Sequence, residues 1–204
     1  TLAEAPMVKP KVALKYIDET NAPVLDMMIQ FASQEADCLF MDFNHIPFSL
    51  RKLKRAYSSW QKGLAGKAWN MLYIENHDHP RMVSRYGSEE FRRESAKMLA
   101  VSYLFLSGTP FIYQGQEIGM LNIKFDSVDQ YTDTQVKSTY QLFKKLGFSD
   151  KMFLKVANRA SRDNSRTPVQ WSAEKNAGFT SGEETWFKVN PNYTEINVEA
   201  AEST

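Results

Sequence analysis

The sequence is poor in cysteine and lacks the common cofactor motifs. Its 204 residues include a single cysteine, Cys38, and no CxxC pair, P-loop or GxGxxG motif. An internal disulfide framework is therefore excluded, and phosphate-loop, dinucleotide and zinc-ribbon sites lack their minimum motif. We accordingly expect no cofactor. One cysteine fits a reducing compartment and we expect a cytoplasmic protein, although many secreted enzymes also have few cysteines.

The sequence also lacks an excess of charge of either sign. There are 25 Lys and Arg residues against 24 Asp and Glu residues, and no basic stripe or acidic tail. This balance gives no reason to expect binding to nucleic acid or to a membrane surface. No apolar run approaches the roughly 20 residues that cross a bilayer, and no signal peptide is visible.

Aromatic side chains are abundant, with 13 Phe, 9 Tyr and 4 Trp. A large hydrophobic core is one explanation, because aromatic rings dominate core burial. Sugar binding is the other, because aromatic faces stack on pyranose rings. Composition alone favours the core. A length of 204 residues suits one domain or a large piece of one.

The stretch at residues 70–81 changes abruptly from apolar to polar. Residues 71–74, Met-Leu-Tyr-Ile, are expected to form a buried strand that ends near Pro80. The polar sequence Glu-Asn-His-Asp-His-Pro-Arg follows at residues 75–81. In parallel α/β folds, active sites are built where strands end in this way.

The remaining patterns predict alternating strands and helices. Further strands are expected at residues 26–31 and 109–113. Helices are expected at residues 8–18, 49–63, 88–108, 136–147 and 150–157, with a short one within residues 195–202. This order indicates right-handed βαβ units around a parallel sheet. Residues 158–182 are expected to form a long loop, and its arginine and aromatic content favours a functional one.

Two of the expected helices have recognisable ends and apolar faces. Ser49 and Ser88 are suitable N-caps, and Gly63 and Gly108 are suitable stops. The apolar face of the first helix comprises Leu50, Leu53, Tyr57 and Trp60. The expected buried stripe of the second comprises Phe91, Met98, Leu99, Phe105 and Leu106.

Three carboxylates at strand ends are candidates for catalysis, namely Glu4, Asp78 and Glu117. Carboxylates in such places suit acid/base chemistry and stabilisation of a positively charged transition state. For a lone Asn-His-Asp, however, hydrogen bonding within a loop is the more common role. We expect no metal site, because His77 and His79 are two residues apart and no third ligand is placed by the sequence.

Asn-His-Asp at residues 76–78, directly after an apolar strand, resembles the fourth conserved region of glycoside hydrolase family 13, the α-amylase family. The sequence resembles the oligo-1,6-glucosidase subgroup in five blocks in unbroken order. That subgroup includes isomaltase, dextran glucosidase, trehalose-6-phosphate hydrolase and sucrose isomerase. The similarity is strong from about residue 70 and weaker before it. The five blocks are residues 76–87, 93–100, 108–120, 161–171 and 189–193.

The resemblance implies an α/β fold that is the C-terminal half of a TIM (β/α)8 barrel, strands five to eight with their helices. Residues 1–6 then resemble the fifth strand of the barrel, although Ala3 and Met7 stand where glycine is commoner in relatives. Residues 1–204 would be part of one catalytic domain. The first four strands, the inserted loop domain and the terminal β-sandwich domain would be absent.

The resemblance also implies the two catalytic carboxyls that this chain can supply. Glu4 corresponds to the general acid/base, and Asp78 to the aspartate that stabilises the oxocarbenium-like transition state. Retaining glycosidases place an acid/base carboxyl and a nucleophilic carboxylate about 5 Å apart. The nucleophile of the family lies on the strand before the acid/base, so no residue here corresponds to it. Asp26 and Asp42 are available carboxylates, but neither matches the nucleophile motif.

Four residues would bind the substrate. By the resemblance, His77 hydrogen-bonds the sugar on the non-reducing side of the cleaved bond. Arg162 closes that subsite, with Arg166 as the second choice, and Arg81 lines the neighbouring subsite.

The expected function is that of a fragment of a retaining α-glucosidase, with α-1,6-linked gluco-oligosaccharides as substrate and the missing half of the barrel as partner. Trehalose-6-phosphate hydrolase, sucrose isomerase and a non-catalytic glycosidase-like scaffold are the alternatives. We expect the chain alone to be inactive, because it lacks the nucleophile. The open edges and uncovered face of half a barrel also favour self-association.

Overall fold

The computed structural model describes residues 1–38 and 46–203. The chain divides into two compact units. The first comprises residues 1–74 and 100–111, and the second comprises residues 75–99 and 112–204. No helix among the described residues is long and apolar enough to cross a membrane.

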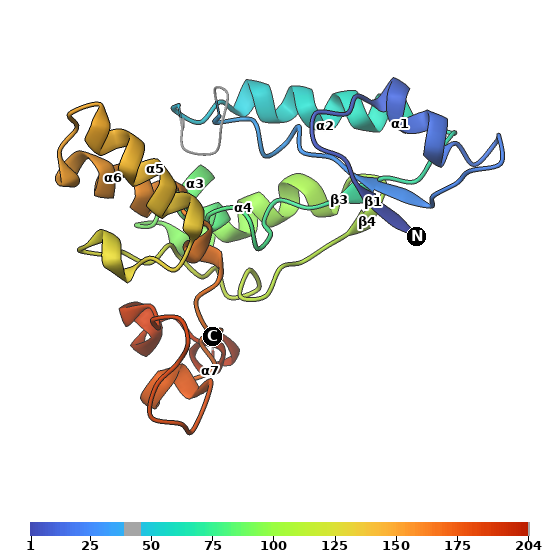
Figure 1. Ribbon diagram of the computed structural model, residues 1–204. Helices are drawn as coiled ribbons and strands as arrows, with labels where there is room; N and C mark the ends of the chain where they lie inside the picture. Colours follow the sequence, from blue (N-terminus) through green and yellow to red (C-terminus); the bar gives the residue numbers. More distant parts are fainter. Residues whose placement is uncertain (39–45, 204) are drawn as a thin grey trace. The chain divides into compact units, whose positions relative to one another are not determined.

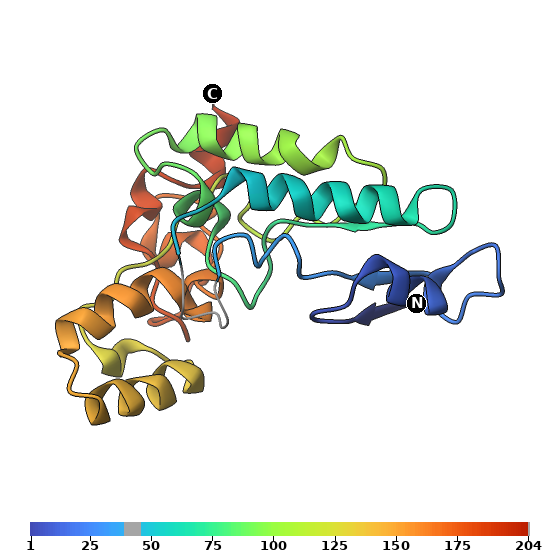
Figure 2. The ribbon, with the colours of Figure 1, turned by 90° about the horizontal axis from the view of Figure 1, so that it is seen from above.

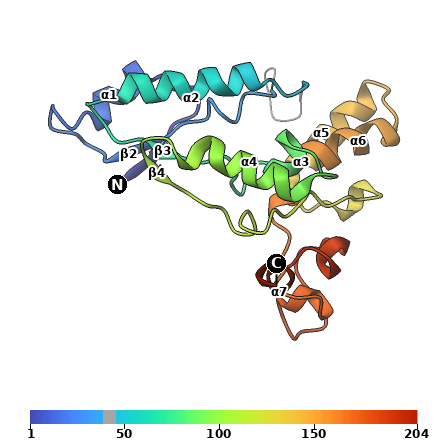
Figure 3. The same cartoon turned by 180° about the vertical axis from the view of Figure 1, so that it is seen from behind.

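The first unit contains two pairs of parallel strands (Figures 1 and 3). Strand β1 (Leu2–Glu4) pairs with β2 (Met27–Ile29), and β3 (Met71–Leu72) pairs with β4 (Thr109–Pro110). The second pair is extended by one bond, in which the Phe111 amide donates to the Leu72 carbonyl at 2.7 Å. Within residues 1–38 and 46–203, all four strands lie in stretches that the sequence predicts, and their parallel direction confirms the predicted βαβ order.

Two helices of the first unit build its core with the first strand pair. Helix α1 (Pro10–Ile17) begins with a proline, which is well tolerated in the first helical turn. Helix α2 (Leu50–Leu64) runs beside α1, as Figure 1 shows. The core cluster they share with β2 comprises Ala13, Ile17, Met28, Trp60 and Leu64.

The ends of α2 differ in part from the prediction. The Ser49 hydroxyl accepts a hydrogen bond from the Lys52 amide at 3.4 Å, which confirms the predicted N-cap. Leu50, by contrast, is 68% exposed, because it lies in the first turn, ahead of the buried part of the face. Gly63 does not end the helix. A Cβ there would lie 2.4 Å from the Cβ of Pro10, so glycine permits the close approach of α1 and α2.

Met7, just after β1, adopts a backbone conformation that favours glycine. Its φ angle is +63° and its side chain is 87% exposed. The left-handed region costs an L-residue about 1–2 kcal/mol, whereas glycine enters it freely. We therefore expect Met7→Gly to raise the free energy of unfolding by about 0.5–1 kcal/mol, after allowing for the greater unfolded-state entropy of glycine. Urea unfolding measures this change. Met7→Ala is the matched control: it removes the side chain, keeps the strain and should leave stability nearly unchanged.

Helix α4 (Arg92–Leu104) buries a face that shares only Leu99 with the predicted apolar stripe. Ser95, Leu99 and Tyr103 are buried at helical spacing. Phe91, Met98 and Phe105, which we expected in the buried stripe, are 58%, 51% and 83% exposed. The apolar pattern correctly predicted a helix. Its spacing could not choose between two faces that both carry large apolar side chains.

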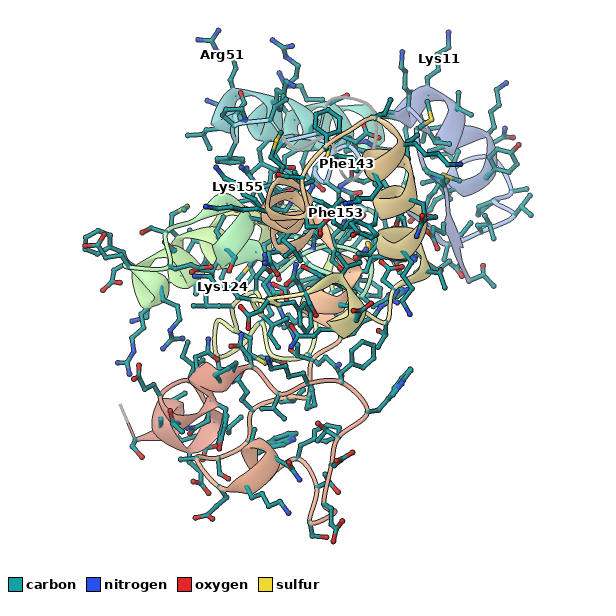
Figure 4. The ribbon with its side chains drawn as sticks, turned by 60° about the vertical axis from the view of Figure 1, so that its left-hand side comes forward. Lys11, Arg51, Lys124, Phe143, Phe153 and Lys155 are labelled. Atoms are coloured by element: carbon teal, nitrogen blue, oxygen red, sulfur yellow. The ribbon has the colours of Figure 1, made fainter. Side chains whose placement is uncertain are left out.

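The second unit consists of short helices and turns. Among them, helices α5 and α6 form a hairpin that is visible in Figure 2. Phe143 of α5 and Phe153 of α6 point toward each other across the hairpin, with ring centroids 5.2 Å apart (Figure 4). Gly147, in the turn between the helices, has a φ angle of +81°, a left-handed conformation that favours glycine after a helix. Besides the first part of α4, the described elements of this unit are α3 (Met82–Tyr86), η1 (Val128–Gln130), α5 (Thr134–Lys145), α6 (Asp150–Ala160), η2 (Arg162–Ser165), η3 (Lys175–Gly178), η4 (Pro191–Thr194) and α7 (Val198–Glu202).

Candidate active site

The polar stretch after β3 begins as an extension of the buried strand. Residues 73–75 are each at most 2% exposed, although strand pairing itself ends at Leu72, earlier than the predicted end near Pro80. The chain then turns sharply. The Asp78 amide donates to the side-chain oxygen of Asn76 at 2.9 Å, a local bond that asparagine often makes in turns. This turn leaves the Asp78 side chain one-third exposed.

Three cationic or potentially cationic side chains surround the Asp78 carboxylate. Arg166 Nη2 donates to Asp78 Oδ1 at 2.9 Å, and Arg162 Nη1 lies 3.6 Å from the same oxygen. His77 Nε2 lies 3.2 Å from Oδ2. The structure thus brings together four of the six predicted site residues, although Arg166 and Asp78 are 88 positions apart in sequence.

Arg166 also connects the two segments that form the site. Its Nε donates to the His77 carbonyl at 3.0 Å while its Nη2 binds Asp78. The arginine therefore fixes both the backbone and the side chain of the turn after β3. Of the two arginines, Arg166 makes the shorter contact with Asp78, and the choice of Arg162 as the arginine that closes the subsite stays a prediction.

The Arg162 guanidinium is bound by the buried carboxylate of Asp133. Its Nε and Nη2 donate to the two oxygens of Asp133 at 3.0 and 2.7 Å, and the Asp133 side chain is fully buried. Burial acts to raise the pKa of Asp133, but hydrogen bonds from Arg162 and the Gln135 amide bring the pKa below its ordinary value. The same hydrogen bonding with Asp133 raises the pKa of Arg162. Both groups are charged at neutral pH.

A second buried aspartate ties the turn at residues 162–165 to the entry of α5. Asp163 Oδ2 accepts from the amides of Thr132 and Asp133 at 2.7 and 3.1 Å. Asp163 Oδ1 accepts from the Thr132 hydroxyl at 3.0 Å. The turn itself is capped by Ser161, whose hydroxyl accepts from the Asp163 amide at 3.1 Å. These bonds fix the backbone from which both arginines project.

Arg81 occupies a different place from the one predicted for it. Its side chain is 0% exposed and forms an ion pair with Glu75, with 2.6 Å between Nη1 and Oε1. Its guanidinium also donates to the Gln114 carbonyl at 2.7 Å and lies 5.4 Å from the centre of the Tyr113 ring. A buried group of this kind does not face a ligand. The structure therefore corrects the predicted subsite role of Arg81 to one of support beneath the turn.

Glu75, the partner of Arg81, is buried to the same degree. Burial raises the pKa of Glu75, and the charge of Arg81 and the Met82 amide, which donates at 2.8 Å, oppose that rise. The pair therefore anchors the start of α3 to the chain at Glu75.

The other candidate carboxylates lie elsewhere. Glu4 is exposed at the carboxyl end of β1, opposite Ile29 in the register, and belongs to the first unit, whereas Asp78 belongs to the second. Its acid/base role stays a prediction. Glu117 is exposed beside Arg92 and Arg93. Asp26 pairs with the amino group of Thr1, and Asp42 lies outside the described residues.

The sequence reasoning missed Asp133 and the partnership of Glu75 with Arg81. Asp133 had a detectable signal: an aspartate directly before a helical pattern is a preferred N-cap, and its carboxylate accepts from the Gln135 amide at 2.9 Å. Its second role toward Arg162 depends on a contact over 29 positions, which no local pattern shows.

The arrangement suits recognition of neutral hydroxyl-rich ligands and stabilisation of positive charge. A partly exposed carboxylate accepts hydrogen bonds from hydroxyls, and it stabilises a cation that develops beside it. The neighbouring guanidinium groups donate hydrogen bonds to ligand oxygens. Within residues 1–38 and 46–203, no group of three His, Cys, Asp or Glu side chains could hold a metal ion.

Comparison with known proteins gives consistent matches over the whole chain. The family model of the alpha amylase catalytic domain matches residues 1–204. The chain is 44% identical to an oligo-1,6-glucosidase of Parageobacillus thermoglucosidasius, covering 98% of this chain and 36% of the relative. It is 42% identical to a trehalose-6-phosphate hydrolase of Bacillus subtilis, covering 91% of this chain and 36% of that relative. The chain therefore spans about a third of the length of these curated relatives.

Solved structures of related enzymes also match this chain over nearly its whole length. The structure of a trehalose-6-phosphate hydrolase of Bacillus licheniformis matches with a TM-score of 0.94 at 40% identity, covering all of this chain and 37% of that one. The structure of an isomaltulose synthase of Protaminobacter rubrum matches with a TM-score of 0.86 at 37% identity, covering 96% of this chain and 35% of that one.

Proposed function

This chain belongs to the alpha-amylase catalytic-domain family, and from that premise we propose that it is part of a retaining α-glucosidase that hydrolyses α-1,6-linked gluco-oligosaccharides. The family and the solved neighbours imply a TIM-barrel glycoside hydrolase. The observation that carries the proposal is the Asp78 carboxylate, which is partly exposed and lies against Arg166, Arg162 and His77. Oligo-1,6-glucosidases at 42–44% identity favour the α-1,6 linkage.

In this proposal the chain supplies strands five to eight of the barrel, as one part of a single catalytic domain. Two pairs of parallel strands joined through helices support that assignment, as does the share of about a third of the length of the relatives. The remaining strands, an inserted loop domain and a terminal β-sandwich domain would come from outside residues 1–204. The partner that completes the site is then the other half of the barrel.

In the proposed chemistry, the carboxyl groups have different roles. Glu4 protonates the leaving oxygen and later activates water, while Asp78 stabilises the oxocarbenium-like transition state by its negative charge. The nucleophilic carboxylate is supplied from outside this chain. His77, Arg162 and Arg166 bind hydroxyls of the sugar on the non-reducing side of the cleaved bond. Residues 1–204 alone are therefore inactive in this proposal.

Trehalose-6-phosphate hydrolysis is the second candidate, because the structural match with that enzyme has a TM-score of 0.94. Sucrose isomerisation has support of the same kind from the isomaltulose synthase neighbours. The three activities differ in substrate and product, so one set of assays separates them.

A hybrid enzyme tests the proposal directly. The region of the Parageobacillus oligo-1,6-glucosidase that this chain matches would be replaced by residues 1–204. We expect the hybrid to release glucose from isomaltose and isomaltotriose, and to act more slowly on trehalose 6-phosphate and sucrose. Product analysis by chromatography measures all of these reactions.

The controls separate an inactive site from a misfolded hybrid. Residues 1–204 alone should show no turnover of p-nitrophenyl-α-glucoside, and robust turnover would contradict the assigned absence of a nucleophile. Circular dichroism and thermal unfolding report whether the hybrid folds. A folded hybrid that hydrolyses none of the substrates would refute the glycosidase proposal, and a preference for trehalose 6-phosphate would favour the second candidate.

A further inference from the structure

We propose that Asp133 is a positioning residue that holds Arg162 back from Asp78, so that the Asp78 carboxylate stays open to a sugar hydroxyl. The inference rests on the proposed function, because it assigns a role in substrate binding to the same site. It extends the site to the α5–α6 hairpin, since Asp133 is the residue that directly precedes α5.

Arg162 is shared unequally between Asp133 and Asp78. Asp133 binds its Nε and Nη2 through two hydrogen bonds of 3.0 and 2.7 Å. Asp78 lies 3.6 Å from the remaining nitrogen, Nη1. Paired hydrogen bonds between guanidinium and carboxylate are the stronger and more directional arrangement. The contact with Asp133 therefore decides where the guanidinium lies.

Asp133 cannot follow Arg162 toward Asp78. Its side chain is fully buried, and one of its oxygens accepts from the Gln135 amide at 2.9 Å, at the start of α5. Its own amide donates to Asp163 Oδ2 at 3.1 Å. Negative charge is favourable at the first turn of a helix, where amide groups lack partners within the helix. Asp133 is thus a fixed anchor, and Arg162 is the movable partner.

The Asp78 carboxylate keeps capacity to accept a hydrogen bond from a ligand. An ionised carboxylate has about four acceptor positions. Arg166 occupies one at Oδ1 with a hydrogen bond of 2.9 Å, and His77 lies 3.2 Å from Oδ2. With Arg162 kept at 3.6 Å, Oδ1 retains room for a ligand hydroxyl. That hydroxyl can donate to Asp78 while its oxygen accepts from Arg162.

Loss of the Asp133 charge would free Arg162 to close on Asp78. A hydrogen bond from Arg162 to Asp78, in place of the present 3.6 Å ion pair, would take up the acceptor position that the sugar needs, and it would move the donor nitrogen away from the ligand oxygen. A misplacement of about 1 Å can lower the rate about 10²-fold. In the hybrid enzyme we therefore expect Asp133→Asn to lower kcat/KM by about 10- to 100-fold.

A double-mutant cycle distinguishes positioning from simple structural support. If Asp133 acts through Arg162, Asp133→Asn should change kcat/KM less than about 2-fold when Arg162 is already alanine, because coupled residues are non-additive. Asp150→Asn is the matched control. Asp150 is an exposed aspartate of the same hairpin, and its carboxylate accepts from Tyr140 and Lys144. Its effect on kcat/KM should be small and should add to that of Arg162→Ala.

A second measurement on residues 1–204 is independent of catalysis. Nitrogen-15 NMR would follow exchange of the Arg162 Nε proton with solvent. We expect slow exchange that accelerates in Asp133→Asn and is retained in Asp150→Asn. Additive effects in the cycle, or an unchanged exchange rate in Asp133→Asn, would overturn the inference. An inactive but folded hybrid would instead refute the proposed function, and the NMR result would still decide whether Asp133 fixes Arg162.

Discussion

Asp78→Asn is expected to lower kcat of the hybrid enzyme by about 10²–10³-fold, with a smaller effect on KM. The substitution keeps the size of the side chain and its ability to accept a hydrogen bond, but it removes the negative charge beside Arg166 and Arg162. In the proposed reaction, positive charge develops on the sugar only in the transition state, so the loss appears mainly in kcat. Steady-state kinetics with isomaltose measures both constants.

Asp129→Asn is the matched control for this prediction. Asp129 is an exposed carboxylate of the same unit, so the same chemical change there should leave kcat within about 2-fold. Thermal unfolding of Asp78→Asn checks that the fold is kept. If Asp78→Asn retained a tenth or more of the kcat of the parent hybrid, Asp78 would not be the carboxylate that stabilises the transition state.

Arg81→Met is expected to produce the largest loss of stability, about 3–5 kcal/mol in the free energy of unfolding. The reason is that Glu75 would remain as a buried charge without its partner, having lost the 2.6 Å contact. Its other hydrogen bond, from the Met82 amide at 2.8 Å, compensates for only part of that cost. Urea unfolding at pH 7 measures the effect.

The sign of the pH dependence follows from the raised pKa of Glu75. Burial raises the pKa in the folded state, so the folded chain binds a proton more readily than the unfolded chain and gains stability as the pH falls. Removing Arg81 strengthens this effect, because the charge that opposes the rise is gone. We therefore expect the deficit of Arg81→Met to shrink between pH 7 and pH 5.

Two further variants make the stability prediction specific. Glu75→Gln combined with Arg81→Met removes both charges and should recover part of the loss. Arg93→Met changes an exposed arginine, and we expect it to alter stability by no more than about 0.5 kcal/mol. A loss for Arg81→Met as small as that for Arg93→Met would show that the buried pair does not support the fold.

Local features of the fold were predictable because they depend on neighbours in sequence. The apolar run at residues 71–74 is buried, and Ser49 caps α2, as its pattern indicated. A strand followed by a helix and another strand predicts parallel pairing, which β1 and β2 show. Capping and periodicity act over a few residues, so a sequence expresses them directly.

The candidate site was only partly predictable. Residue types and family resemblance together indicated His77, Asp78, Arg162 and Arg166, and the structure places them around one carboxylate. They could not indicate that Arg81 is fully buried against Glu75. An arginine near a strand end has the same sequence signature whether it faces a ligand or a buried acid.

The sequence alone determined the family, the order of strands and helices and the identity of the charged residues near Asp78. The tertiary structure decided which of those charges are exposed and which are paired. In the structure Arg81 is buried, and Leu99 rather than Met98 lies on the buried face of α4. Asp133, which is far away in sequence, binds Arg162. Burial and ion pairing depend on distances between residues far apart in the chain. No pattern of neighbouring residues contains those distances.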